Sequence, residues 1–138
     1  VKRVDRAVAK TIIDRTEAHV RASGAQMAGA QLRVLGGAMA RVPADATAYA
    51  LRSSRIMVNL FSIYGTPEEA PAHEAWIAKM ATELDQGDPG VYVNFLDDEG
   101  VERIRAAYPG KTWDRLRTIK RRYDPANVFR LNQNIPPA

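Results

Sequence analysis

A phenol and a carboxamide stand two residues apart in one stretch of this chain, as Tyr92 and Asn94. A phenol ionises near pH ~10, and it can act as a general base where a positive or hydrogen-bonding neighbour favours the phenolate. A carboxamide both donates and accepts hydrogen bonds, so it can orient a ligand beside such a base. The other reading, common among strands, is an exposed or hydrogen-bonded polar face without chemistry.

A strand is predicted to position this pair. Residues 91–96 form a β-rich run that follows the turn-forming sequence Gly-Asp-Pro-Gly at 87–90. Successive side chains of a strand point to opposite faces, so Tyr92 and Asn94 share one face with Leu96. The opposite face is wholly apolar and is predicted to meet a core; it carries Val91, Val93 and Phe95. After the strand, Asp97, Asp98 and Glu99 offer capping and first-turn residues for a helix.

Other elements are predicted on both sides of this strand. Helical spacing of apolar residues predicts helices over 3–21, from Thr66 onward, over 101–108 and over 112–123. Strands are predicted at 31–35, 47–52 and 56–64, the last two paired as a hairpin. Residues 127–137 are too polar and proline-bounded for a helix. The sequence therefore predicts one α+β domain over 1–138: an antiparallel sheet of about four strands, helices covering one face, and an extended C-terminal arm.

Composition excludes several classes of protein. The chain of 138 residues has no cysteine and two histidines, so a disulfide framework and a thiolate or histidine-rich metal site are excluded. His19 is expected on the surface near a helix end. His73 is expected beside the core, with no Ser, Cys or second His close to it in the sequence. No apolar run is long enough to span a membrane, and we expect a cytoplasmic protein without a membrane partner.

The sequence resembles the end of a berberine-bridge-enzyme-like oxidase, of the FAD-linked, PCMH type. The resemblance rests on the run YVNFLD at 92–97, Ala107-Tyr108, Arg115-Leu116 and the run KRRYDPANVFRLNQNIPP at 120–137. Gly36-Gly37-Ala38 and residues 47–55 resemble bacterial members less specifically. The motifs lie in the family's order and spacing over the end of the chain. The resemblance therefore implies the C-terminal substrate domain of a flavoprotein.

The resemblance also implies a function. In that family an open sheet face lies over the flavin, and a Tyr at the position of Tyr92 takes the substrate proton as hydride leaves for the flavin. Asn94 would then orient substrate or flavin, and Asn132, Gln133 and Asn134 match the arm that returns to the flavin domain. Phe95 stands where many relatives carry a second Tyr, so a two-tyrosine scheme is not implied. The implied substrate is a small alcohol, sugar or secondary metabolite.

The flavin-binding half of such an oxidase is absent from this sequence. FAD is therefore expected to be held mainly by a missing N-terminal domain of the same or another chain, and the opening Val-Lys-Arg-Val-Asp indicates an excised or processed segment. The isolated chain is expected to hold no cofactor, to be inactive, and to form a homodimer through its exposed sheet face.

Two alternatives from other classes stay open. The chain can be a stand-alone protein-binding or dimerisation module that uses the same sheet face. It can also bind nucleic acid through the basic helix; this helix carries Lys111, Arg115, Arg117, Lys120, Arg121 and Arg122. A net charge of only +4 and the lack of stacking aromatics among these charges argue against nucleic acid, so none is expected as a partner.

Overall fold

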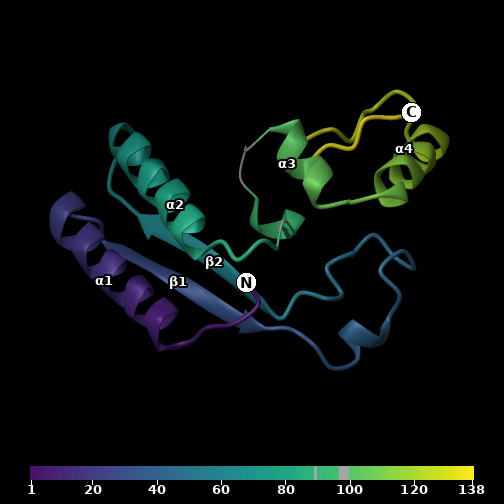
Figure 1. Cartoon of the computed structure of the whole chain (residues 1–138). Helices are drawn as coiled ribbons and strands as arrows, with labels where there is room; N and C mark the ends of the chain where they lie inside the picture. The colour runs from purple at the N-terminus through teal and green to yellow at the C-terminus, as the bar shows by residue number, and fades with distance from the viewer. Residues whose placement is uncertain (89, 97–99) are drawn as a thin grey trace. The chain divides into compact units, whose positions relative to one another are not determined.

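The computed structural model describes residues 1–88, 90–96 and 100–138 (Figure 1). Its contacts divide the chain into two compact units. The first contains Val1–Leu35 and Ser54–Asp88; the second contains Gly36–Ser53 and the described residues that follow Pro89. The chain therefore crosses between the units three times, and each unit is built from segments distant in sequence.

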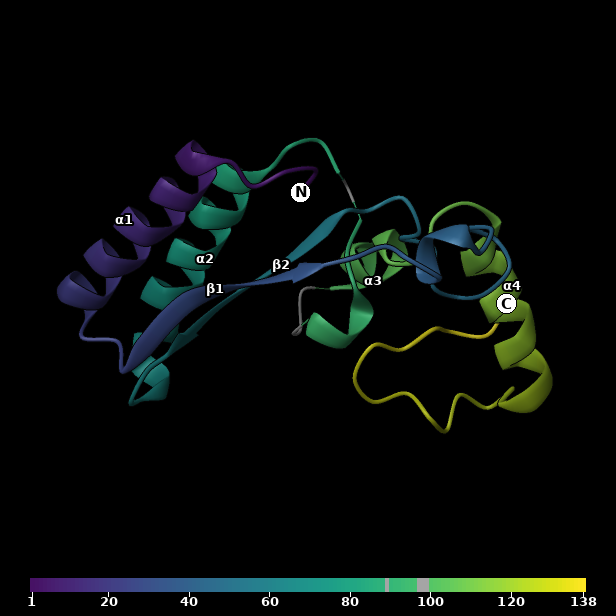
Figure 2. The same cartoon turned by 90° about the horizontal axis from the view of Figure 1, so that it is seen from below.

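The first unit is a two-stranded antiparallel sheet with two helices on one face. Strand β1 (Met27–Val34) pairs with β2 (Ile56–Ile63) in a register that runs from Met27 opposite Ile63 to Val34 opposite Ile56. Helices α1 (Arg6–Ser23) and α2 (Ala70–Leu84) lie side by side over this ribbon (Figures 1 and 2). The α+β class is confirmed.

The prediction of about four strands is wrong for the described residues, which form two. Residues 47–52 are bends and turns, and 91–96 contain the short 3₁₀ helix η3 (Val93–Phe95). The expected hairpin between 47–52 and 56–64 does not form: β2 pairs with β1, and its other edge has no strand partner among the described residues. Asp97, Asp98 and Glu99, predicted to start a helix, lie outside the described residues, as does Pro89 of the predicted turn.

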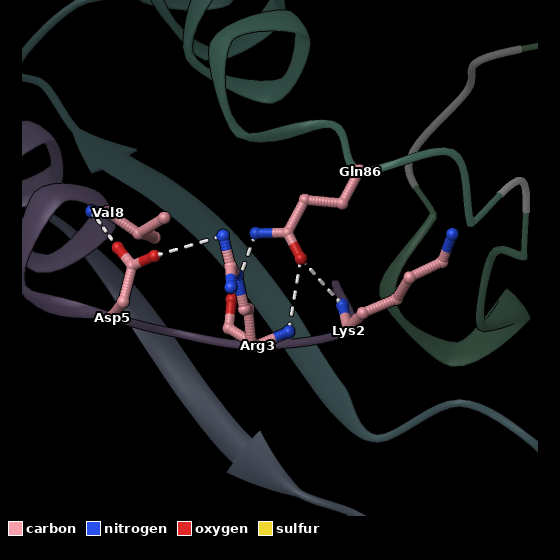
Figure 3. A network of polar contacts seen from close by, with 5 residues as sticks. All are labelled: Lys2, Arg3, Asp5, Val8 and Gln86. Carbon is pink, nitrogen blue, oxygen red and sulfur yellow. Dashed lines mark hydrogen bonds and ion pairs between the residues drawn. The ribbon is translucent and has the colours of Figure 1, made fainter.

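Local signals explain where α1 begins and ends. The Asp5 carboxylate accepts a hydrogen bond from the Val8 backbone N–H at 3.0 Å, which satisfies one donor of the first turn. Gly24 ends the helix in the left-handed conformation at φ 68°, where glycine carries no steric cost. Gln86, just after α2, binds the backbone of Lys2 and Arg3 through three hydrogen bonds (Figure 3). The start of α1 is thereby fixed to the end of α2.

The core of the first unit lies between the helices and the sheet. Met80 is 2% exposed, and Leu84 and Ala25 are also buried. On the other face of the sheet, the Phe61 ring covers Gly29 so closely that a Cβ there would lie 3.1 Å from Phe61 Cζ. The glycine in β1 is thus explained by the aromatic ring across the strand pair.

The second unit has its own interior. Helices α3 (Val101–Ala106) and α4 (Lys111–Tyr123) contribute the buried residues Ile104 and Trp113, with Ala107 between the two helices. A short 3₁₀ helix, η1 (Met39–Arg41), belongs to the same unit; η2 (Pro67–Glu69) leads into α2 in the first. The helical and strand apolar residues do not belong to one core: Trp76, Met80, Leu84 and Phe61 lie in the first unit, and Leu116 and Ile119 lie in the second.

The C-terminal arm after α4 has no helix or strand, as predicted, but it is not extended: it forms a loop whose end returns to α4 (Figure 2). The Asp124 carboxylate accepts hydrogen bonds from the backbone N–H groups of Val128 and Phe129, and this turns the chain. Arg117 and Arg121 donate to the carbonyl groups of Pro137 and Ala138. Part of the basic face of α4 therefore binds the arm of the same chain.

No helix within the described ranges combines the length and the apolar character that a membrane crossing requires.

Candidate active-site tyrosine cluster

Tyr92 and Asn94 are in direct contact, although no strand brings them together. Tyr92 precedes η3, and the turn places the Asn94 amide so that its Nδ2 donates a hydrogen bond to the Tyr92 phenolic oxygen at 2.8 Å. Tyr92 is half-buried and Asn94 is exposed. A 3₁₀ turn therefore produces the proximity that strand alternation was expected to produce. The open sheet face predicted for the pair is not part of this arrangement.

Two further rings complete the cluster around Tyr92. The Tyr49 ring meets it edge to face at 5.6 Å between centroids, and the Phe95 ring lies at 5.7 Å. Tyr49 comes from the irregular segment 36–53, far away in sequence. Sequence reasoning missed Tyr49, because the segment was assigned to a strand and nothing local connects it to Tyr92.

Arg52 holds the segment that carries Tyr49. Its guanidinium lies 4.9 Å from the Tyr49 ring centroid and donates hydrogen bonds to the carbonyl groups of Tyr49 and Met39. A third bond reaches the Thr47 hydroxyl at 2.7 Å. One side chain thus fixes the loop and places a positive charge beside the cluster.

Ionisation of the neighbouring phenols is disfavoured. Burial raises the pKa of Tyr49 above its ordinary value; the Arg52 charge lowers it in part, and Tyr92 raises it. Burial also raises the pKa of Tyr108, and Tyr92 adds to that effect. Ionised tyrosines in this unit oppose one another, so a phenolate at one position discourages a second.

The three amides of the arm have different environments. The Gln133 amide donates to the Leu96 carbonyl at 2.8 Å, so the arm contacts the segment that carries Tyr92. Asn132 adopts a positive φ of 59°, which asparagine tolerates, and its carbonyl accepts from the Asn134 N–H. The buried Asn134 Oδ1 has no hydrogen-bond partner within the described residues. Asn127 Oδ1, at the start of the arm, is likewise buried and without a partner there, so the arm holds two such acceptors among the described residues.

The structure brings the two histidines together in the first unit. His19 Nε2 lies 2.9 Å from His73 Nδ1, and the Ser62 hydroxyl lies 2.9 Å from the same His73 atom. His19 is half-buried and His73 is 1% exposed. The expectation of a surface position for His19 is therefore wrong, and the lack of a Ser or His near His73 in the sequence did not exclude such neighbours in the fold. The partners come from other elements, and sequence spacing contains no signal for them.

Comparison with known proteins places these residues in a family. Residues 91–136 match the family model described as "Berberine and berberine like". The chain is 38% identical over 112 residues, 81% of its length, to an uncharacterized FAD-linked oxidoreductase, YgaK, of Bacillus subtilis. It is 33% identical over 109 residues, 73% of its length, to xylooligosaccharide oxidase of Thermothelomyces thermophilus. It is 30% identical over 135 residues, covering 74% of its length, to berberine bridge enzyme-like C-1 of Nicotiana tabacum.

The chain spans about a quarter of the length of these curated relatives: 25%, 22% and 24%, respectively. The family match covers Tyr92, Asn94, Phe95 and the arm, while the relatives also align outside it. The chain therefore belongs to the berberine-bridge-enzyme-like family of FAD-linked oxidoreductases.

Proposed function

We propose that this chain is the substrate-domain part of an FAD-dependent oxidoreductase that oxidises a small alcohol, sugar or secondary metabolite by hydride transfer to flavin. The observation that carries the proposal is the Tyr92 phenol with the Asn94 amide donating to its oxygen, inside the segment that matches the family. The names of relatives, among them an oxidase of xylooligosaccharides, support an alcohol or sugar substrate.

The chemistry of Tyr92 follows from its hydrogen bond. Oxidation of an alcohol removes a proton from the hydroxyl and a hydride from the carbon; when bound, FAD supplies the acceptor for the hydride. Tyr92, as phenolate, accepts the hydroxyl proton at its oxygen. The Asn94 N–H donates to the same oxygen, so the amide orients the phenol for this transfer.

The residues present fit contact with a flavin ring better than the binding of its pyrophosphate. Asn134 Oδ1, which has no partner among the residues that the structure describes, is an acceptor of the kind that ring N–H groups satisfy. Gly36 and Gly37 lead into η1, which has three residues and is too short to present a helix N-terminus to a diphosphate. We therefore assign most of the FAD binding to a separate flavin-binding domain, and we expect the chain alone to be inactive.

The arm offers a surface to that domain. Val128, Phe129 and Leu131 are 70%, 82% and 85% exposed, a concentration of apolar side chains on one short segment. Because the relatives are about four times longer than the match, the rest of such a protein is the proposed occupant of this surface. A second copy of the chain, forming a homodimer, is the alternative that the same exposed residues favour.

A chimera tests the function. The aligned part of the xylooligosaccharide oxidase is replaced by this chain, and flavin reduction is followed anaerobically with oligosaccharides and simple alcohols. Tyr92→Phe should slow flavin reduction by about 10²-fold or more, with a smaller effect on substrate affinity. Tyr123→Phe is the matched control, because Tyr123 is 75% exposed on α4. Equal rates for the two variants would remove Tyr92 from the chemistry.

A further inference from the structure

Three polar side chains from three elements of the first unit converge at one point. His19 comes from α1, Ser62 from β2 and His73 from α2. His19 Nε2 lies 2.9 Å from His73 Nδ1 and 3.2 Å from Ser62 Oγ, and Ser62 Oγ lies 2.9 Å from His73 Nδ1. Each atom is thus within hydrogen-bond reach of the other two. The proposed oxidase chemistry uses none of them.

Aromatic rings enclose the two imidazoles. His19 is stacked on Trp76 with ring centroids 4.3 Å apart, and His73 is stacked on Tyr64 at 4.7 Å. The two imidazoles meet edge to face. His73 is 1% exposed, so water cannot solvate a charge on it without movement of these rings. The cluster is therefore a buried titratable site.

No carboxylate in the described part of the chain forms an ion pair with either imidazole. On α1, Glu17 pairs with Arg21 at the surface, and Ser23 donates to the His19 carbonyl. On the sheet side the neighbours are Ser62 and Tyr64; on α2, the Glu74 that follows His73 is exposed. Burial lowers the pKa of His19 below its ordinary value, and His73 lowers it further. A positive charge here therefore lacks a compensating partner.

The hydrogen-bond geometry limits the number of protons. With both rings neutral, one of the facing nitrogens carries a hydrogen and the other accepts it. With one ring protonated, the same contact is an imidazolium donating to a neutral imidazole. With both rings protonated, two N–H groups would point at each other across 2.9 Å, and two charges would be buried together.

We propose that the His19–His73–Ser62 cluster is a pH-sensitive latch, which holds α1 and α2 on β2 while at most one imidazole is protonated and releases them when both become charged. Release would separate α1 from α2 and β2 at the end of α1, where His19 lies. This separation would expose to solvent the face of the sheet that the two helices cover. The latch depends on the fold of the first unit alone and does not rest on the proposed oxidase activity.

The sign of the pH dependence follows from proton counting. The unfolded chain binds two protons at its histidines once the pH lies below their ordinary pKa of about 6.5, whereas the folded cluster binds at most one. The unfolded state therefore binds more protons, and stability falls as the pH decreases through this range. The folding equilibrium constant should fall by about tenfold per pH unit for each excess proton.

Urea unfolding of the whole chain between about pH 7 and pH 5 tests the latch, above the range where most carboxylates titrate. Trp76 fluorescence reports on the first unit when the other tryptophan is removed by Trp113→Phe; the chain has two tryptophans. His19→Gln and His73→Asn keep an amide near the position of the bonding nitrogen and cannot take up a charge. The parent should lose stability toward pH 5, and each variant should lose less than the parent.

Ring NMR gives a second measurement that does not need His73→Asn to fold. The chain has two histidines, so their signals can be assigned with His19→Gln alone. We expect the pair to take up protons in two steps, with the second well below the ordinary histidine range. Two independent titrations near pH ~6.5, or a parent whose stability is the same across the pH range, would overturn the proposal.

Discussion

At the scale of single residues, the Tyr49 phenol is the group whose ionisation reports on the cluster around Tyr92. Burial raises its pKa first, and the proximity of Tyr92 raises it as well. We expect Tyr92→Phe to lower the pKa of Tyr49 toward its ordinary value near ~10, because a neighbouring phenolate can no longer form. The measurement is the phenolate absorbance during an alkaline titration, with Tyr49→Phe identifying the Tyr49 signal.

The same shift has a consequence for stability. A phenol with a raised pKa in the folded state stays protonated where the unfolded chain already ionises, so stability is lost as the pH rises above ~10. Tyr49→Phe should weaken this alkaline loss, and Tyr123→Phe, at an exposed ring, should leave it unchanged. An identical alkaline profile for both variants would contradict the assignment of the raised pKa to Tyr49.

The close contact between Gly29 and the Phe61 ring leads to a second prediction at the residue scale. An added Cβ would lie 3.1 Å from Phe61 Cζ and 3.3 Å from Cε1, so the ring must move. Gly29→Ala should destabilise the chain by about 1 kcal/mol, measured by urea unfolding. Gly65→Ala is the matched control because its nearest atom lies at 3.9 Å, and it should be neutral or slightly stabilising. A stable Gly29→Ala variant would show that Phe61 can shift freely.

At the scale of elements, Asp124 joins helix α4 to the arm. The hydrogen bond from Lys120 lowers its pKa below the ordinary 3.8, and the backbone N–H groups of Val128 and Phe129 lower it further. The ionised Asp124 carboxylate therefore stabilises the folded chain above pH 3.8, and this stabilisation is lost as the pH falls below 3.8. Asp124→Ala should raise the exchange rates of the Val128 and Phe129 amide hydrogens, measured by NMR.

Asp114→Ala is the control for this prediction, since it removes a carboxylate from the first turn of the same helix. It should leave the exchange of the arm amides unchanged. Equal protection in the parent and in Asp124→Ala would mean that Arg117, Lys120 and Arg121 hold the arm without the carboxylate.

At the scale of the whole molecule, we expect a core substitution to destabilise mainly the unit that contains it, because the chain forms two compact units. Leu84 is 5% exposed in the first unit, and Ile104 is 8% exposed in the second. Each change to alanine should cost about 2–5 kcal/mol in the unit that contains it. Hydrogen exchange should rise after Leu84→Ala mainly in residues 1–35 and 54–88, and after Ile104→Ala mainly in 36–53 and 90–138. Uniform loss of protection after either change would show a single cooperative fold over 1–138.

Self-association is the other prediction at this scale. Without a partner domain, the exposed Phe129 and Leu131 should drive association of the isolated chain at micromolar concentration. The double change Phe129→Ser and Leu131→Ser should shift sedimentation toward the monomer. Val34→Ser removes an 87% exposed apolar side chain from β1 and serves as the control. A monomeric parent chain would contradict the prediction.

The sequence by itself determined the features that depend on local signals. Helix periodicity located α1 and α4 to within a few residues, because the pattern lies in neighbouring residues. The predicted start of the first helix at residue 3 missed the cap at Asp5. The proline-bounded, amide-rich segment after Asp124 was correctly predicted to form no helix, although it turns back to α4 and is not extended. The order of motifs from Tyr92 to Pro137 identified the family, because that information lies along the chain and needs no folding.

Tertiary structure decided which distant residues meet. Residues 47–52 and 91–96 have β-forming composition, but neither segment joins the sheet of β1 and β2; both belong to the second unit, whereas the sheet belongs to the first. Tyr49 reaches Tyr92, and His19 reaches His73 and Ser62, only through packing of elements far apart in sequence. Strand pairing and side-chain clusters depend on non-local contacts, and packing context overrides a local strand preference. For that reason the sequence could predict a role for Tyr92 but not the residues that surround it.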